Sequence, residues 1–146
     1  MPTELDKALD TIIGQLTQPG QTFATTPFER FGVEMPVFVN APPTLAHYFA
    51  HFCNEHRDAT FLVDGDCRLT FGECWQAASH VAAGLAQNHG VSKGARVGIA
   101  ARNSANWAIA YMGVILAGGC ATLLNGFWSG DELAFGVRLA ECDLVL

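Results

Sequence analysis

The fold is decided by residues 94–146, which read GARVGIAARNSANWAIAYMGVILAGGCATLLNGFWSGDELAFGVRLAECDLVL. Short apolar runs alternate here with segments of helical spacing, a pattern typical of parallel strands joined by crossover helices. The sequence therefore predicts the fold class α/β, with a parallel sheet and flanking helices in the order β-α-β-α-β over residues 96–146. The predicted strands are RVGIAA, CATLL and DLVL, and the predicted helices span residues 104–117 and 131–140.

Two predicted helices begin with Ser or Thr followed three residues later by Glu, which is the pattern of a capping box. Thr70 and Glu73 open a helix that continues at helical spacing to Gly90. Ser129 and Glu132 open the last helix of the chain. Because each box supplies partners for backbone N–H groups at a helix start, these two beginnings are well defined by the sequence.

The residues before position 70 predict a helix and a β-hairpin. Thr44 follows a proline pair and is expected to cap a helix that runs to about His56. The runs TFLVD and CRLTF then flank the turn Gly65-Asp66, which is a hairpin pattern.

The first 43 residues differ in character from the remainder. Residues 3–17 place leucine and isoleucine on one side of a helix, which the Gln18-Pro19-Gly20 sequence stops. Residues 21–43 contain four prolines and no sustained period, so we expect an extended arm. The predicted organisation is an N-terminal helix and arm over residues 1–43, then an incomplete α/β subdomain over residues 44–146.

Length and composition limit the classes of function. The chain has 146 residues, of which 50% are hydrophobic and 15% charged, and a net charge of −6. This composition excludes intrinsic disorder and fits one folded domain. Eight basic residues stand against fourteen acidic ones with no basic run, so we expect no nucleic-acid partner. The first residues lack the pattern of an export signal, which favours a cytoplasmic location.

The five cysteines are an odd number, and none has the C-x2-C spacing of a zinc or redox site. We expect reduced thiols. Cys74 lies on an apolar helix stripe and Cys120 in a predicted strand, so both are expected to be buried and unreactive. The cysteines are Cys53, Cys67, Cys74, Cys120 and Cys142.

The sequence contains no charge between Arg102 and Asp131. Its apolar part, residues 107–117, would be about 16 Å long as a helix, whereas a bilayer core is about 30 Å thick. We therefore predict no transmembrane segment.

Three potential metal ligands, His47, His51 and Glu55, follow one another at single helical turns. The H-E-x-x-H pattern is absent, and the other positions of this helix are aromatic. A solvated histidine face is the better interpretation, so no metal ligand is assigned.

The glycines do not form a phosphate-binding loop. Neither G-x-G-x-x-G nor G-x-x-x-x-G-K-[ST] occurs, and the predicted strand-to-helix turn at residues 101–104 has no glycine. Gly118-Gly119 is explained by the end of a helix. The glycines considered were Gly90, Gly94, Gly98, Gly118 and Gly119.

The best candidate for a ligand-binding wall is Asn125-Gly126-Phe127-Trp128, because open α/β sheets bind ligands at the carboxyl ends of their strands. An equally good interpretation is that these aromatic residues pack on a further subdomain. The chain ends at Leu146, inside a predicted apolar strand, so we expect it to be truncated, with a sheet that continues in later residues.

Residues 69–85 and 94–146 together resemble the N-terminal part of an adenylate-forming (AMP-binding) acyl-CoA synthetase. The resemblance covers about residues 40–146. Residues 15–45 and 126–133 are similar to a bacterial fatty-acid–CoA-ligase-like branch. Leu124 stands where many members have a proline before the asparagine, which leaves the substrate class open. The motifs that carry the resemblance are Thr70-Phe71-Gly72-Glu73, Arg102-Asn103-Ser104 with Trp107, Ala117-Gly118-Gly119 and Asp131-Glu132-Leu133.

The resemblance implies a two-step ligation, in which a carboxylate attacks the α-phosphate of Mg-ATP and the thiol of coenzyme A then displaces AMP. The parent enzyme would use ATP, Mg²⁺ and coenzyme A with a small-molecule carboxylic acid, a fatty acid by the narrower likeness. The family's phosphate loop, metal-binding carboxylate, ribose-binding acid and mobile C-terminal domain have no counterpart in these residues. We therefore assign no catalytic, cofactor-binding or metal residue, and expect the isolated chain to be inactive.

Two other functions are compatible with the sequence. The chain could be a stand-alone α/β binding module that buries its open sheet edge by forming a homo-oligomer. A peripheral membrane role through the uncharged residues 103–130 is the third hypothesis.

Overall fold

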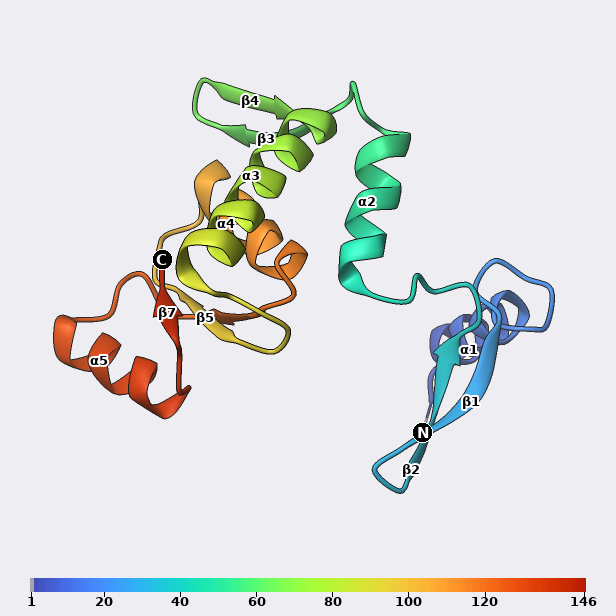
Figure 1. The fold of residues 1–146 in the computed structure, drawn as a ribbon. Helices are drawn as coiled ribbons and strands as arrows, with labels where there is room; N and C mark the ends of the chain where they lie inside the picture. The colour runs from blue at the N-terminus through green and yellow to red at the C-terminus, as the bar shows by residue number, and fades with distance from the viewer. Residues whose placement is uncertain (1) are drawn as a thin grey trace. The chain divides into compact units, whose positions relative to one another are not determined.

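The computed structural model describes residues 2–146. The chain divides into two compact units, the first ending at Pro43 and the second beginning at Thr44 (Figure 1). Each unit is built from its own helices and strands.

The second unit contains the predicted parallel sheet. Three strands, β5 (Arg96–Ile99), β6 (Cys120–Leu123) and β7 (Leu144–Val145), lie in the order β6-β5-β7, and both strand pairs are parallel. Helix α4 (Ala105–Leu116) joins β5 to β6, and helix α5 (Gly130–Leu139) joins β6 to β7. The predicted β-α-β-α-β order is therefore confirmed, with β5 in the centre.

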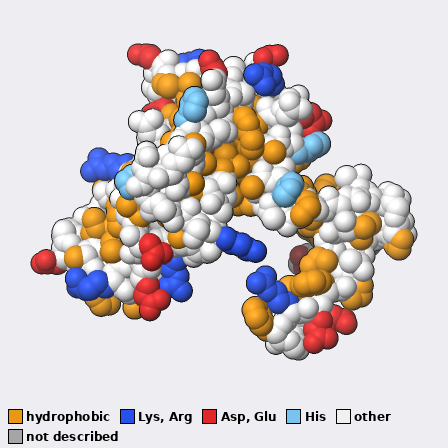
Figure 2. All heavy atoms as spheres, in the orientation of Figure 1, with side chains coloured by type: hydrophobic (Ala, Val, Ile, Leu, Met, Phe, Trp, Pro, Cys, Tyr) orange, Lys and Arg blue, Asp and Glu red, His pale blue; other side chains and the backbone are white. Residues whose placement is uncertain are grey.

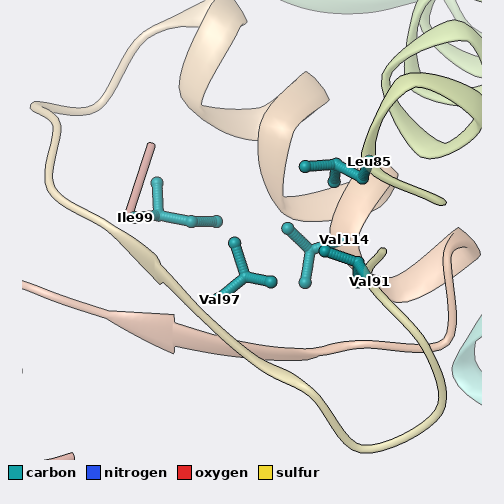
Figure 3. Close-up of a cluster of buried hydrophobic side chains, with 5 residues drawn as sticks. All are labelled: Leu85, Val91, Val97, Ile99 and Val114. Atoms are coloured by element: carbon teal, nitrogen blue, oxygen red, sulfur yellow. The ribbon is translucent and has the colours of Figure 1, made fainter. Parts of the chain in front are cut away.

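The core of this unit lies between the central strand and the helices. Val97 and Ile99 of β5 are buried against Val114 of α4, as Figure 3 shows. Leu85, near the end of helix α3 (Phe71–His89), and Val91, just after it, complete this cluster. Val97 and Ile99 are two residues apart along β5, so both side chains point to the same face of the sheet, which α4 covers.

Helices α3 and α4 approach closely at Gly113. A Cβ at this position would lie 2.5 Å from Val81 Cγ1 and 3.2 Å from the carbonyl oxygen of Ala78. Only glycine fits there without displacing α3. A second cluster, formed by Cys53, Ala78 and Met112, joins helix α2 (Leu45–Glu55) to α3 and α4.

The predicted hairpin is present as β3 (Thr60–Asp64) and β4 (Cys67–Thr70), which pair antiparallel. The side chain of Asp64 accepts a hydrogen bond from the backbone N–H of Ala105 at 3.0 Å, so the hairpin also holds the first turn of α4. The capping boxes at Thr70 and Ser129 and the cap at Thr44 are confirmed.

The first unit corrects one prediction. Residues 21–43 were expected to form an extended arm, but β1 (Thr25–Arg30) and β2 (Val33–Phe38) form an antiparallel hairpin after helix α1 (Glu4–Leu16). The turn residues Phe31 and Gly32 both have positive φ, 55° and 76°, as a two-residue type I′ turn requires.

The register explains how prolines fit this hairpin. Pro27 lies directly opposite Pro36. The backbone N–H of Val39 donates to the carbonyl oxygen of Ala24 at 2.8 Å, and paired positions alternate between bonded and non-bonded along an antiparallel ladder. Counting from Ala24 and Val39, the proline pair falls on a non-bonded position, so neither nitrogen is needed between the strands.

Helix α1 is present as predicted, but none of its residues is buried. Its leucines and isoleucines stay on the surface of the first unit. No helix within residues 2–146 combines the length and apolar character that a bilayer crossing requires.

The capping box of α3 predicts a measurable loss of stability. Replacing Thr70 by Ala removes the oxygen that accepts from the Glu73 backbone N–H at 3.1 Å, so the free energy of unfolding should fall by about 1 kcal/mol. Urea unfolding followed by circular dichroism measures this change. Thr70→Ser keeps the oxygen and should cost clearly less; equal losses for both variants would contradict the capping role.

The same box predicts a pH dependence. Hydrogen bonds from the Thr70 backbone and side chain lower the pKa of Glu73 below its ordinary value of 4.5. Its contribution to stability is therefore complete above pH 4.5 and is lost as the pH falls through the lower pKa of the folded state. Glu73→Gln cannot titrate, so its stability should fall less than that of the wild type between neutral pH and about pH 3. Parallel curves for the two proteins would contradict this assignment.

Two helical glycines give a matched pair. Gly113→Ala places a methyl group against Val81 and should destabilise the chain by about 1–3 kcal/mol. Gly84→Ala on α3 meets open space and should stabilise it by up to about 1 kcal/mol. Thermal unfolding of both variants tests the pair, and a stabilising Gly113→Ala would show that α3 and α4 do not pack this closely.

Candidate functional site

A cleft of about 610 Å³ lies at the carboxyl ends of β5 and β6. It is the position at which open α/β sheets bind ligands. Three of the four predicted wall residues, Asn125, Gly126 and Phe127, line it. The complete lining is Ala101, Arg102, Asn103, Trp107, Leu123, Leu124, Asn125, Gly126 and Phe127.

The fourth predicted residue, Trp128, lies outside the lining of this cleft. Its ring covers Gly136 of α5, where a Cβ would lie 2.5 Å from Trp128 Cζ3. The two interpretations of residues 125–128 therefore apply to different residues. Phe127 and its neighbours line the cleft, whereas Trp128 packs on a helix of the same unit.

At Gly126 the loop after β6 packs directly against the backbone of the loop after β5. A Cβ there would lie 2.7 Å from the carbonyl carbon of Ala101 and 2.8 Å from the backbone nitrogen of Arg102. These neighbours are main-chain atoms that cannot rotate away. The floor of the cleft depends on this glycine.

A tight turn directs Phe127 toward the cleft. The side-chain oxygen of Asn125 accepts from the Phe127 backbone N–H at 3.0 Å, and its carbonyl oxygen accepts from the Trp128 N–H at 3.1 Å. Phe127 is 74% exposed, and the guanidinium carbon of Arg102 lies 4.4 Å from the centre of its ring. This distance is typical of a cation–π interaction.

The lining of the cleft contains no side chain that commonly acts as a nucleophile or as a general acid or base. Arg102 is the only charged residue of its lining, and no carboxylate, thiol, hydroxyl or histidine side chain is among the lining residues. Trp107 supplies an aromatic wall, held parallel to Tyr111 at 5.8 Å between ring centres. The lining is therefore aromatic and amide-bearing, with one positive charge.

The sequence interpretation missed Arg102 and Trp107 as cleft residues. Arg102 and Trp107 entered the sequence interpretation as part of a family motif, and residues 101–104 as a turn without the glycines of a pyrophosphate loop. The useful signal was position, because residues after two adjacent parallel strands meet at one sheet edge. Which strands are adjacent becomes known only from the strand order.

The three potential metal ligands on α2 do not converge. His51 Nε2 lies 3.3 Å from Glu55 Oε2, whereas His47 Nδ1 lies 2.7 Å from Thr44 Oγ1, at the start of the helix. Over residues 2–146, no group of three or more His, Cys, Asp or Glu side chains is arranged to hold a metal ion.

The predicted burial of the cysteines is right for Cys74 and wrong for Cys120. Cys74 is fully buried, and burial, with smaller effects of Cys53, Glu73 and Cys67, raises the pKa of its thiol to about 11. A thiol with this pKa stays protonated and is a poor nucleophile. Cys120 is exposed because it begins β6, which is an edge strand of the sheet.

The glycines assigned to structure have structural roles. Gly118 has a φ of 83° where α4 ends, and Gly90 has a φ of 65° at the end of α3. A Cβ on Gly98 would lie 2.9 Å from Leu124 Cδ1, so this glycine serves packing within the sheet.

Comparison with known proteins identifies the family. The family of AMP-binding enzymes matches residues 49–146. A medium/long-chain-fatty-acid–CoA ligase of Mycobacterium tuberculosis, FadD6, is 33% identical over 113 residues, which are 73% of this chain and 19% of that protein. A 4-coumarate–CoA ligase-like protein of rice is 31% identical over 119 residues, which are 78% of this chain and 20% of that protein.

A solved structure shares the fold. The N-terminal subdomain of Klebsiella oxytoca NpsA superposes with a TM-score of 0.66 at 19% identity, covering 70% of this chain and 27% of that one. The chain spans about a fifth of the length of the two CoA ligases. With its sheet, its capped helices and the cleft at the strand ends, the chain belongs to the family of AMP-binding enzymes and has the fold of part of their N-terminal subdomain.

Proposed function

We propose that the chain forms the N-terminal part of an ATP-dependent carboxylic acid–CoA ligase that acts through an acyl-adenylate, with a fatty acid as its substrate. The observation that carries the proposal is the match of residues 49–146 to the AMP-binding enzymes. The fatty acid is supported by the likeness to a medium/long-chain-fatty-acid–CoA ligase. The two steps, adenylation and transfer to coenzyme A, are those of acid–CoA ligation.

The described residues do not fit ATP or Mg²⁺. The cleft has no carboxylate for a metal ion. The nearby N-terminus of α4, which could otherwise meet a phosphate, is already held by the carboxylate of Asp64 and the hydroxyl of Ser104. We therefore propose that this unit carries no catalytic group and that the isolated chain is inactive.

The cleft is proposed to form one wall of the passage for the acyl chain or for the pantetheine arm of coenzyme A. Its apolar surfaces, Trp107, Leu123 and Phe127, suit a methylene chain, and the amides of Asn103 and Asn125 suit the polar groups of pantetheine. The acyl chain and the pantetheine arm are both long and narrow, and either fits along a cleft at the end of a sheet.

A cytoplasmic location is proposed as well. It is supported by the five cysteines, which are all free thiols. Free thiols are usual in the reducing cytosol.

The inactivity of the isolated chain is tested by ATP–pyrophosphate exchange with fatty acids. The 146-residue chain should give no exchange above background, whereas the product of the same gene extended through its downstream codons should exchange label in an acid-dependent manner. Exchange by the 146-residue chain would refute the inactivity, and an extended protein inactive with every acid tested would count against the ligase assignment.

The role of the cleft is tested by Phe127→Ala in the extended protein. If Phe127 lines the acyl passage, the KM for the acid in the exchange reaction should rise by about tenfold, which corresponds to the loss of one aromatic contact. If it lines the pantetheine passage, exchange should be unchanged and the KM for coenzyme A should rise instead. The KM for ATP should stay constant in both cases. Phe31→Ala, at the tip of the first hairpin, is the matched control, and equal effects of both variants would remove Phe127 from the passage.

A further inference from the structure

Helix α5 has apolar residues on two faces. Its inner face packs on the unit through half-buried Leu133 and Val137. Its outer face carries Phe135 and Leu139, which are 61% and 72% exposed. The two are four residues apart and therefore adjacent on one side of the helix.

Hydrogen bonds from Arg96 hold the C-terminal end of α5 beside the sheet. Arg96 Nη1 donates to the carbonyl oxygen of Ala140 at 3.1 Å and to the carboxylate of Glu141 at 2.5 Å. Arg96 also donates through its backbone N–H to Asp143 at 2.8 Å. These bonds tie the end of α5 to the central strand β5.

A groove of about 470 Å³ runs along the outer face. Trp128 forms one wall and leaves part of its ring exposed, while the helix forms the other. Figure 2 shows hydrophobic side chains over α5 with charged ones beside them. The groove is lined by Trp128, Asp131, Glu132, Phe135, Gly136 and Leu139.

The charges on this face are separated along the helix. Asp131 and Glu132 lie in the first turn and Arg138 in the last. Asp131 and Arg138 are seven residues apart, about 10 Å along the axis, which is too far for a salt bridge within one helix. Within residues 2–146 the ion pairs are Lys7–Glu4, His51–Glu55 and Arg96–Glu141, so Arg138 pairs with no acid there.

We propose that the outer face of α5 is an interface with a second copy of this chain, in which two α5 helices pack antiparallel across a twofold axis. Centred on Phe135, this arrangement places Arg138 of each copy opposite Asp131 and Glu132 of the other. Leu139 of each copy then covers the groove beside Trp128 of the other. A twofold interface must be complementary to itself, and a helix with acids at one end and a cation at the other satisfies that condition.

The second copy suits this face because of its charge pattern. A single helix pair buries less than the roughly 1,200–2,000 Å² of a stable interface, so the dimer is weak and depends on concentration. It differs from pairing at the sheet edges, which would use the backbone of β6 or β7 and would be insensitive to the charge of residue 138.

Analytical ultracentrifugation of the 146-residue chain over a range of concentrations tests the interface. The wild type should show a reversible monomer–dimer equilibrium. Arg138→Glu and Asp131→Arg should each raise the dissociation constant by about tenfold or more, because like charges then face each other. The double variant Arg138→Glu/Asp131→Arg sets opposite charges at positions 138 and 131 across the axis, although the new carboxylate at position 138 still faces Glu132 of the other copy. Its dissociation constant should therefore fall below that of Arg138→Glu without reaching that of the wild type.

Lys93→Glu, an equal change of charge on an exposed loop, is the matched control and should leave the dimer unchanged. Thermal unfolding followed by circular dichroism checks that every variant is folded. A wild type that is monomeric at every concentration would overturn the proposal. A dimer insensitive to Arg138→Glu would overturn it in favour of pairing at a sheet edge. A double variant that dimerises no better than Arg138→Glu alone would overturn it as well.

Discussion

The burial of Val97 and Ile99 of β5 beneath Val114 of α4 is the contact on which the second unit depends. It fixes the central strand against its covering helix, and both neighbouring strands are then aligned by hydrogen bonds to β5. The close approach of α3 to α4 at Gly113 adds a second helix to the same side. Because β5 and β6 pair in register, the two strands stop at the same edge of the sheet. The cleft lies at this edge, between the loops that follow the two strands.

Local signals in the sequence predicted much of this unit. The capping boxes at Thr70 and Ser129 are read from four positions, and each forms as expected because its bonds lie within one helical turn. Features that depend on distant residues could not be predicted. The exposure of Cys120 follows from the edge position of β6, and the place of Arg102 in the cleft follows from the adjacency of β5 and β6. Neither fact is visible in the residues next to them.

The cleft is built from residues that shape a surface and not from nucleophiles, acids or bases. Gly126 closes its floor by backbone contact, Asn125 sets the turn, and Phe127 with Arg102 forms the rim. Each of these residues positions a surface, and none carries a carboxylate, thiol, hydroxyl or imidazole group. The chain spans about a fifth of the length of its two CoA-ligase relatives. In the proposed ligase, the part described here shapes a passage.

The opposed prolines of the first hairpin affect how its two outer edges can pair with other strands. Pro27 and Pro36 turn their nitrogens outward, so each outer border of this two-stranded ribbon lacks a donor near its middle. An extended segment of another molecule would therefore find an interrupted ladder on either side. Pro27 and Pro36 made the hairpin hard to predict from the sequence. In the structure they hinder the addition of further strands, which is the first step of amyloid-like growth.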